Sequence, residues 1–127
     1  MNYQILTLSL LSLVVLVAPA GNTEENQEAQ AELSCDVGPI SRNFGGSDWI
    51  VYSCNDKNTF VVVSAEGNPA APFYFISTIK DNSRTLQGEG SGEKAASSAA
   101  YEDLRKFISS EDQVQDLLLQ TRTKGSP

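Results

Sequence analysis

The chain has 127 residues with 16 acidic and 9 basic side chains, two Cys and no His, and its formal net charge is −7 at pH 7. This length allows one small domain. The acidic balance disfavours nonspecific binding to nucleic acid or anionic membranes, because both are negatively charged. The lack of His excludes Ser–His and Cys–His catalysis and His-ligated zinc or haem. We therefore expect no cofactor and no metal.

The N-terminus has the order of a secretory signal peptide. Residues 1–20 carry no charged side chain, and residues 5–17 form an apolar run interrupted only by Thr and Ser. The small residues Ala18-Pro19-Ala20 follow as a cleavage sequence. The run is shorter than the ~20 residues of a membrane span, so an uncleaved anchor is the less favoured alternative. We predict cleavage after residue 20, no stable membrane anchor afterwards, and export to the periplasm or the extracellular space.

Residues 21–32 contain no apolar side chain larger than Ala and hold four Glu. Such a composition cannot bury enough surface to offset the entropy lost on ordering, so it predicts an acidic disordered linker. We expect a single folded domain over residues 33–124 and a short tail at residues 125–127.

Cys35 and Cys54 are the only cysteines. In an exported chain they are expected to form a disulfide. Closing a loop of this length stabilises a domain by about 3 kcal/mol. A redox-active pair needs a closer spacing such as C-x-x-C, which is absent. We therefore predict a structural bond.

Aromatic and β-branched runs, separated by turn-forming residues, predict an antiparallel sheet of four or five strands. These runs lie at residues 40–44, 49–52, 60–63, 73–79 and, more weakly, 85–88. A turn at Gly45-Gly46 would join the first two strands and place Cys54 opposite Val37. A small bend would then bring Cys35 within reach of Cys54.

After Gly92 the apolar period changes from that of a strand to that of a helix. The stripe of the first predicted helix consists of Ala96, Ala100, Leu104, Phe107 and Ile108. Ser109, followed by Asp112, resembles a capping box at the start of a second helix. The inward residues of that helix are Val114, Leu117 and Leu118. The predicted fold class is α+β, with a C-terminal two-helix hairpin on one face of the sheet.

The central strands are apolar on both faces, whereas an antiparallel sheet with one wet face alternates apolar and polar residues. Two short helices can cover only one face. The other face is covered by the chain itself, as by curling of the sheet, or by a partner or second copy. We select the following candidate partner-binding residues: Trp49, Val51, Tyr52, Tyr74, Gly90, Ser91 and Gly92.

The glycine-rich segment Gly88–Lys94 lies between the last predicted strand and the first predicted helix. It departs from the phosphate-loop pattern G-x-x-x-x-G-K-[ST], so we interpret it as a connecting turn, with a protein-binding loop as the alternative. Carboxylates on predicted loops show no spacing that singles out a catalytic pair. These carboxylates are Asp48, Asp56, Glu66, Asp81 and Glu89. We predict no catalytic residue.

Residues Tyr52–Asp56, followed by Phe60–Val62, resemble the opening of periplasmic inhibitors of C-type lysozyme. In that family a Tyr-x-Cys strand leads through an Asp-containing turn into a second strand with an aromatic residue. The resemblance implies a β-barrel whose Ser-Gly-x-x-Tyr loop enters the enzyme cleft. Here Ser91–Ala95 lacks the Tyr and leads into predicted helices, so no site residue is carried over.

The function that we expect is that of a small exported accessory protein, not an enzyme. It would bind another macromolecule or itself through an apolar face of the sheet. The alternative is an inhibitor of an exported hydrolase that acts through Gly88–Lys94. A third hypothesis is a weak hydrolase that uses loop carboxylates.

Overall fold

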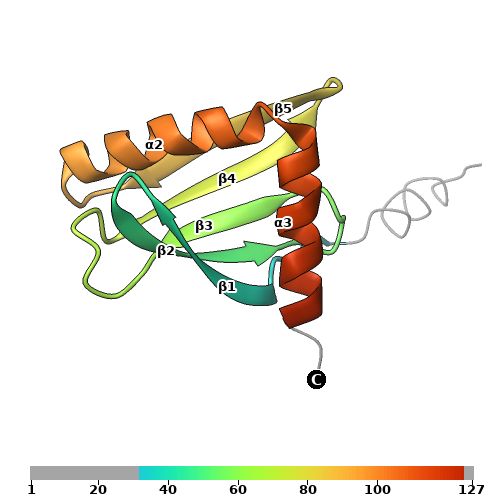
Figure 1. The fold of residues 1–127 in the computed structure, drawn as a ribbon, viewed down its shortest axis with the longest axis horizontal. Helices are drawn as coiled ribbons and strands as arrows, with labels where there is room; N and C mark the ends of the chain where they lie inside the picture. The colour runs from blue at the N-terminus through green and yellow to red at the C-terminus, as the bar shows by residue number, and fades with distance from the viewer. Residues whose placement is uncertain (1–31, 125–127) are drawn as a thin grey trace, which may run out of the picture. The chain divides into compact units, whose positions relative to one another are not determined.

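The computed structural model describes residues 32–124, in which five β-strands precede two α-helices (Figure 1). The elements are β1 Val37–Phe44, β2 Ser47–Ser53, β3 Phe60–Ser64, β4 Phe73–Lys80, β5 Ser83–Gly90, α2 Lys94–Ile108 and α3 Glu111–Lys124. The compact unit that holds them begins at Leu33. The predicted α+β class is confirmed. The predicted signal peptide, the linker up to residue 31 and the tail lie outside the described residues.

The five strands form one antiparallel sheet in chain order, so β1 and β5 are its edges. Gly45 and Gly46 make the predicted turn between β1 and β2, with φ angles of 65° and 83°. Positive φ at both turn residues matches the right-handed twist of the flanking strands. β5 is longer than the short strand expected, because Asp81 and Asn82 adopt the same turn geometry and pairing starts directly after them.

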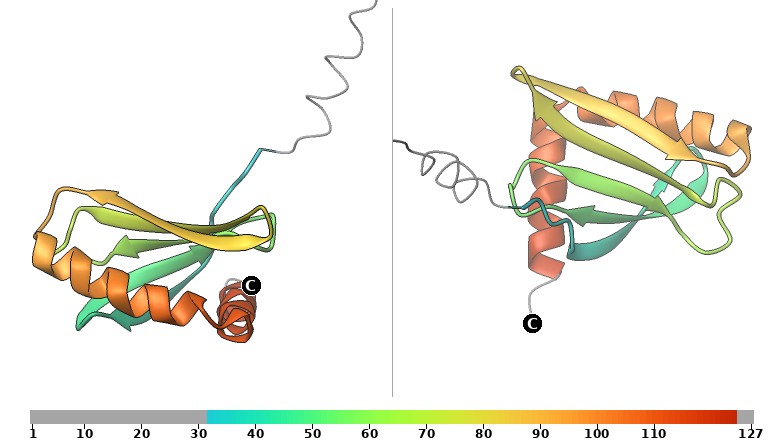
Figure 2. Two further views of the ribbon diagram at one scale, coloured as in Figure 1. Left: turned by 90° about the horizontal axis from the view of Figure 1, so that it is seen from above. Right: turned by 180° about the vertical axis from the view of Figure 1, so that it is seen from behind.

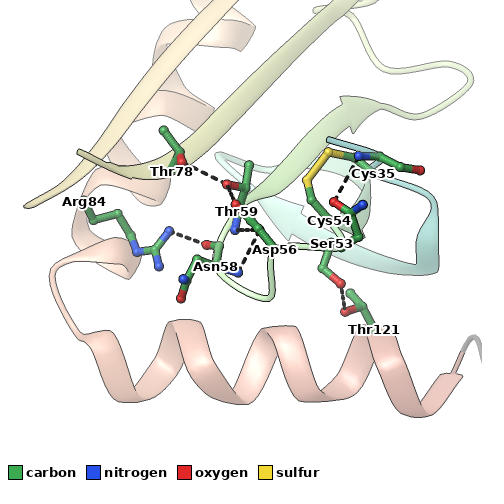
Figure 3. The surroundings of a disulfide bond; sticks show 11 residues. Cys35, Ser53, Cys54, Asp56, Asn58, Thr59, Thr78, Arg84 and Thr121 are labelled. Carbon is green, nitrogen blue, oxygen red and sulfur yellow. Dashed lines mark hydrogen bonds between the residues drawn. A yellow bond between two sulfur atoms is a disulfide. The ribbon is translucent and has the colours of Figure 1, made fainter. Parts of the chain in front are cut away.

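The predicted pairing of Val37 with Cys54 is wrong by one residue, because β1 contains an irregularity and Val37 faces Ser53. Gly38 lies in this irregularity with a φ of 119°, a backbone conformation that favours glycine. An extra residue of this kind bends the strand. The predicted disulfide is present, with an S–S distance of 2.03 Å between Cys35 and Cys54 (Figure 3).

Both helices lie on the same face of the sheet (Figure 2, left). The core between them and the sheet contains Trp49, Val51, Phe60, Val62, Phe75, Ala100, Leu104, Val114, Leu117 and Leu118. α3 turns away from α2 where α2 ends, so the two helices do not lie side by side as in a hairpin (Figure 1). α2 approaches the β1–β2 turn closely, because a Cβ on Gly45 would overlap the backbone of Ala100.

The start of α3 differs from the prediction, because Ser110, not Ser109, caps it. The Ser110 hydroxyl accepts a hydrogen bond of 3.3 Å from the backbone N–H of Gln113. Ser109 still has helical φ and ψ angles of −69° and −15°, and its hydroxyl donates to the Lys106 carbonyl at the end of α2. An N-cap residue needs an extended conformation, which Ser109 does not have.

Arg84 on β5 fixes the first turn of α3. Its guanidinium donates two hydrogen bonds of 3.1 and 3.0 Å to the Glu111 carboxylate, although the Arg84 side chain is only 5% exposed. Further donors reach the Asn58 carbonyl at 2.9 Å and the Ser77 hydroxyl at 3.2 Å. The hydrogen bond from Arg84 lowers the pKa of Glu111 below its ordinary value. The buried cation is therefore paired and hydrogen-bonded, as burial of a charge requires.

Candidate functional site

The face of the sheet that points away from the helices carries six apolar side chains, and we call this the outer face. Its residues are Ile50 and Tyr52 from β2, Val61 and Val63 from β3, and Tyr74 and Ile76 from β4. Val63 is 37% and Tyr74 is 42% exposed, and the other four are half-buried by their neighbours. Within residues 33–124 no helix crosses this face (Figure 2, right). The central strands thus carry apolar residues on both faces, as predicted.

The partner-binding residues selected from the sequence divide between the two faces. Tyr52 and Tyr74 lie on the outer face. Trp49 and Val51 lie on the inner face, and both are fully buried beneath the helices. The indole N–H of Trp49 donates a 3.2 Å hydrogen bond to the Phe44 carbonyl. The surface available to a partner therefore does not include Trp49 and Val51.

The other three selected residues, Gly90, Ser91 and Gly92, lie against the connection between β3 and β4. A Cβ on Gly92 would overlap the Ala70 carbonyl oxygen, and one on Gly90 would overlap the Pro72 carbonyl oxygen. The backbone N–H of Ser91 donates a 3.0 Å hydrogen bond to the same Pro72 oxygen. The glycines therefore permit close backbone packing, and the segment is held against its neighbour and does not project as a free loop.

An open groove of about 670 Å³ continues the outer face past the ends of β3 and β4, and we call it the acidic groove. Its apolar wall is formed mainly by Val63, Pro72 and Tyr74, and its two charged residues are Glu66 and Glu89. The Tyr74 hydroxyl donates a 3.3 Å hydrogen bond to Glu89. None of the basic side chains in the described part of the chain lines the groove. Two carboxylates beside an aromatic ring favour a cationic group with an apolar stem.

Of the described residues that line this groove, only Tyr74 and Gly90 were selected from the sequence as partner-binding residues. Val63 follows the same alternation as Tyr74, so the strand pattern could have identified it. Glu66 lies in the connection between β3 and β4, and no local pattern brings it to the same groove as Glu89. Only the tertiary path of that connection places the two carboxylates together.

Asp56 stabilises the turn between β2 and β3 (Figure 3). Its carboxylate accepts hydrogen bonds from the Thr59 hydroxyl at 2.6 Å and from the N–H groups of Asn58 and Thr59 at 2.9 and 2.8 Å. Partial burial acts to raise the pKa of Asp56, but these hydrogen bonds outweigh it and the pKa lies below its ordinary value. The role of this carboxylate is thus structural.

The remaining loop carboxylates do not converge on one site, since Glu66 shares the acidic groove with Glu89 and a separate hollow with Asp48. Asp48 accepts a 3.2 Å hydrogen bond from the Asn43 side chain at one end of the sheet. Asp81 occupies the turn between β4 and β5. Within the described residues there is no group of three or more His, Cys, Asp or Glu side chains that could hold a metal ion.

Comparison with known proteins gives no relative from which a function could be transferred. No protein family matches the chain, and no curated protein or solved structure matches it. None of the helices in residues 32–124 has the length and apolar character needed to span a bilayer.

Proposed function

We propose that this chain is a small exported, non-catalytic protein that binds another protein through the outer face. The observation that carries the proposal is the row of apolar side chains on that face, with Val63 and Tyr74 exposed. Contiguous exposed apolar surface on a small soluble domain marks an interaction site. Export is supported by the order of residues 1–20 and by the disulfide, since disulfides persist in oxidising compartments.

The acidic groove defines the chemistry of the partner. Among residues 32–124, its lining holds Glu66 and Glu89 and no basic side chain, and Tyr74 forms part of its wall. A Lys or Arg of the partner fits this lining, because its alkyl stem packs on the apolar wall and its charge meets the carboxylates. Apolar neighbours of that Lys or Arg would cover the outer face. A second copy of this chain is a poorer occupant, because its net charge of −7 opposes self-association.

The alternative of a hydrolase inhibitor that acts through the glycine-rich segment gains no support from this geometry. An inhibitory loop must project into an enzyme cleft. The backbone of Ser91 and Glu93 is instead hydrogen-bonded to Pro72 and Pro69 at 3.0 Å in both cases. We therefore retain the outer face as the proposed binding surface.

A photo-crosslinking experiment tests the proposal in the native host. A photoreactive residue is placed at Val63 on the outer face or, as a control, at Ile79 on the opposite side of β4. We expect one dominant crosslinked protein from position 63 and not from position 79. Crosslinks that form equally from both positions, or none from position 63, would contradict the proposal. Crosslinks only between copies of the chain would make a second copy the occupant.

The affinity of the purified partner supplies a second test with a matched pair of variants. Tyr74→Ser and Ile79→Ser remove apolar side chains of β4 that are 42% and 41% exposed. We expect Tyr74→Ser to weaken binding by about tenfold or more, as for a residue at the centre of an interface. Ile79→Ser should leave the affinity unchanged. Equal effects of the two substitutions would show that the outer face is not the binding surface.

The intact mass of the protein recovered from the host tests export separately. Loss of residues 1–20 is the expected result. A full-length mass would contradict export of the processed protein, even if the outer face binds as proposed.

A further inference from the structure

A second surface lies where β1 runs beside α3, away from the outer face. An open groove of about 770 Å³ separates them, and we call it the edge groove. Residues 39–42 of β1 line one side of it, and Leu119 and Lys124 of α3 belong to the other. In the part of the chain that the structure describes, β1 is an edge strand that pairs only with β2. One side of the groove is therefore a strand with a free edge.

The backbone of β1 can accept a further strand at this edge. The two-residue turn makes Phe44 a position whose N–H and C=O groups bond to β2. Such positions alternate along an antiparallel strand, so the N–H and C=O groups of Arg42 and Ile40 also face β2. Those of Ser41 and Asn43 face the free edge, and both residues are exposed. Unpaired groups of this kind are a template for addition of an extended peptide.

The side chains of the edge groove combine an apolar surface with positive charge. Leu119 is 53% exposed on the α3 side. Arg42 donates a 2.6 Å hydrogen bond to the side chain of Gln120, and it has no ion pair within residues 32–124. Lys124 has none there either. Within residues 32–124, no carboxylate lines the groove, although the chain as a whole is acidic. The charged side chains of the described residues that line the groove, Arg42 and Lys124, are therefore both basic.

We propose that the edge groove binds an extended acidic segment of another protein, which adds to β1 as a sixth strand. Alternate side chains of a strand point to the same side, so an apolar residue and a carboxylate two positions apart would both face the groove. The apolar residue contacts Leu119, and the carboxylate meets Arg42 and Lys124. Pairing of β1 with β1 of a second copy would bring two positive edges together, which charge repulsion opposes. The proposal does not depend on the function of the outer face.

Selection of random octapeptides on the full chain, with its disulfide intact, tests this directly. We expect the enriched peptides to share an apolar residue and a Glu or Asp two positions away. The affinity of the best peptide should fall with rising salt concentration. Its binding should slow hydrogen exchange at the backbone amides of Ser41 and Asn43, because both become hydrogen-bonded in the added strand.

Exposed residues provide variants that leave the fold intact, as thermal unfolding can verify. Leu119→Ser and Lys124→Glu should each weaken the selected peptide about tenfold. Ile79→Ser, a matched exposed apolar residue outside the groove, and Tyr74→Ser, on the outer face, should have no effect.

Four results would overturn the proposal. These are no enriched peptide, a consensus without an acidic residue, unchanged exchange at Ser41 and Asn43, and binding that depends on Tyr74. Dimerisation of the chain that Leu119→Ser abolishes would replace the acidic peptide with a second copy. Binding that depends on Tyr74 would place the peptide on the outer face, whereas the other results do not bear on the function proposed for that face.

Discussion

Val62 and Val63 are neighbours on β3 and differ only in the face they occupy, so they form a matched test of one-sided coverage by the helices. Val62 is fully buried in the core, and Val63 is 37% exposed on the outer face. Val62→Ala removes two methyl groups from the core, which loses about 1.6 kcal/mol of transfer free energy at about 0.8 kcal/mol per group. The cavity left behind raises the expected cost to about 2–3 kcal/mol.

Val63→Ala removes the same groups from a surface that water already reaches. Its expected cost is about 0.5–1 kcal/mol, mainly from the lower strand propensity of Ala. Urea unfolding of both variants with the disulfide intact measures the two free energies, and an unchanged m-value ensures that they can be compared. Equal costs would contradict one-sided coverage of the sheet by the helices. If both substitutions were costly, the outer face would be covered as well. If both had a small cost, the helices would not pack on the inner face.

Two further substitutions test a charge contact and a backbone contact. The hydrogen bond from Arg84 lowers the pKa of Glu111 in the folded protein. The contact therefore contributes its full free energy of unfolding above the pKa of the unfolded carboxyl, about 4.3. This contribution is lost as the pH falls through the lower pKa of the folded state. Glu111 is half exposed, so solvent screening limits the cost of Glu111→Gln to about 1 kcal/mol at pH 7. Urea unfolding should show that the difference in free energy of unfolding between the wild-type protein and this variant vanishes in acid. A difference independent of pH would contradict the ion-pair assignment. Gly92→Ala must displace the Ala70 carbonyl, and we expect thermal unfolding to show a loss of about 1–3 kcal/mol, whereas an unchanged Tm would contradict the close packing.

Local signals predict much of this fold. The strands, the Gly45-Gly46 turn and both helices follow from periodicity and turn residues, which act over a few positions. The errors in the register of β1 and in the cap of α3 arise where a local signal competes with a neighbour. The register at Val37 depends on the positive φ of Gly38, and the cap of α3 depends on how far α2 continues through Ser109.

The direction of α3 could not be predicted, because contacts distant in sequence fix it. Arg84 of β5 holds Glu111 in its first turn. Near its other end, the hydroxyls of Ser53 and Thr121 lie 2.6 Å apart in the core (Figure 3). The Thr121 hydroxyl donates to the Leu118 carbonyl, so Ser53 is the donor to Thr121. These two contacts hold α3 across the sheet and away from α2, and neither leaves a pattern in the helix sequence itself.

The choice of which face the helices cover does have a signal in the sequence, and it lies in the aromatic residues. Periodicity alone treats the two faces alike. Trp49 and Phe75 lie on the inner face, whereas Tyr52 and Tyr74 lie on the outer face. A tyrosine hydroxyl buried beneath helices would need a hydrogen-bond partner there, and on an open face water or an exposed carboxylate satisfies it. The hydroxyl of Tyr74 meets Glu89 in this way. A tyrosine-bearing face is thus stable when uncovered and offers apolar area when a partner docks, which is the combination that a reversible binding surface requires.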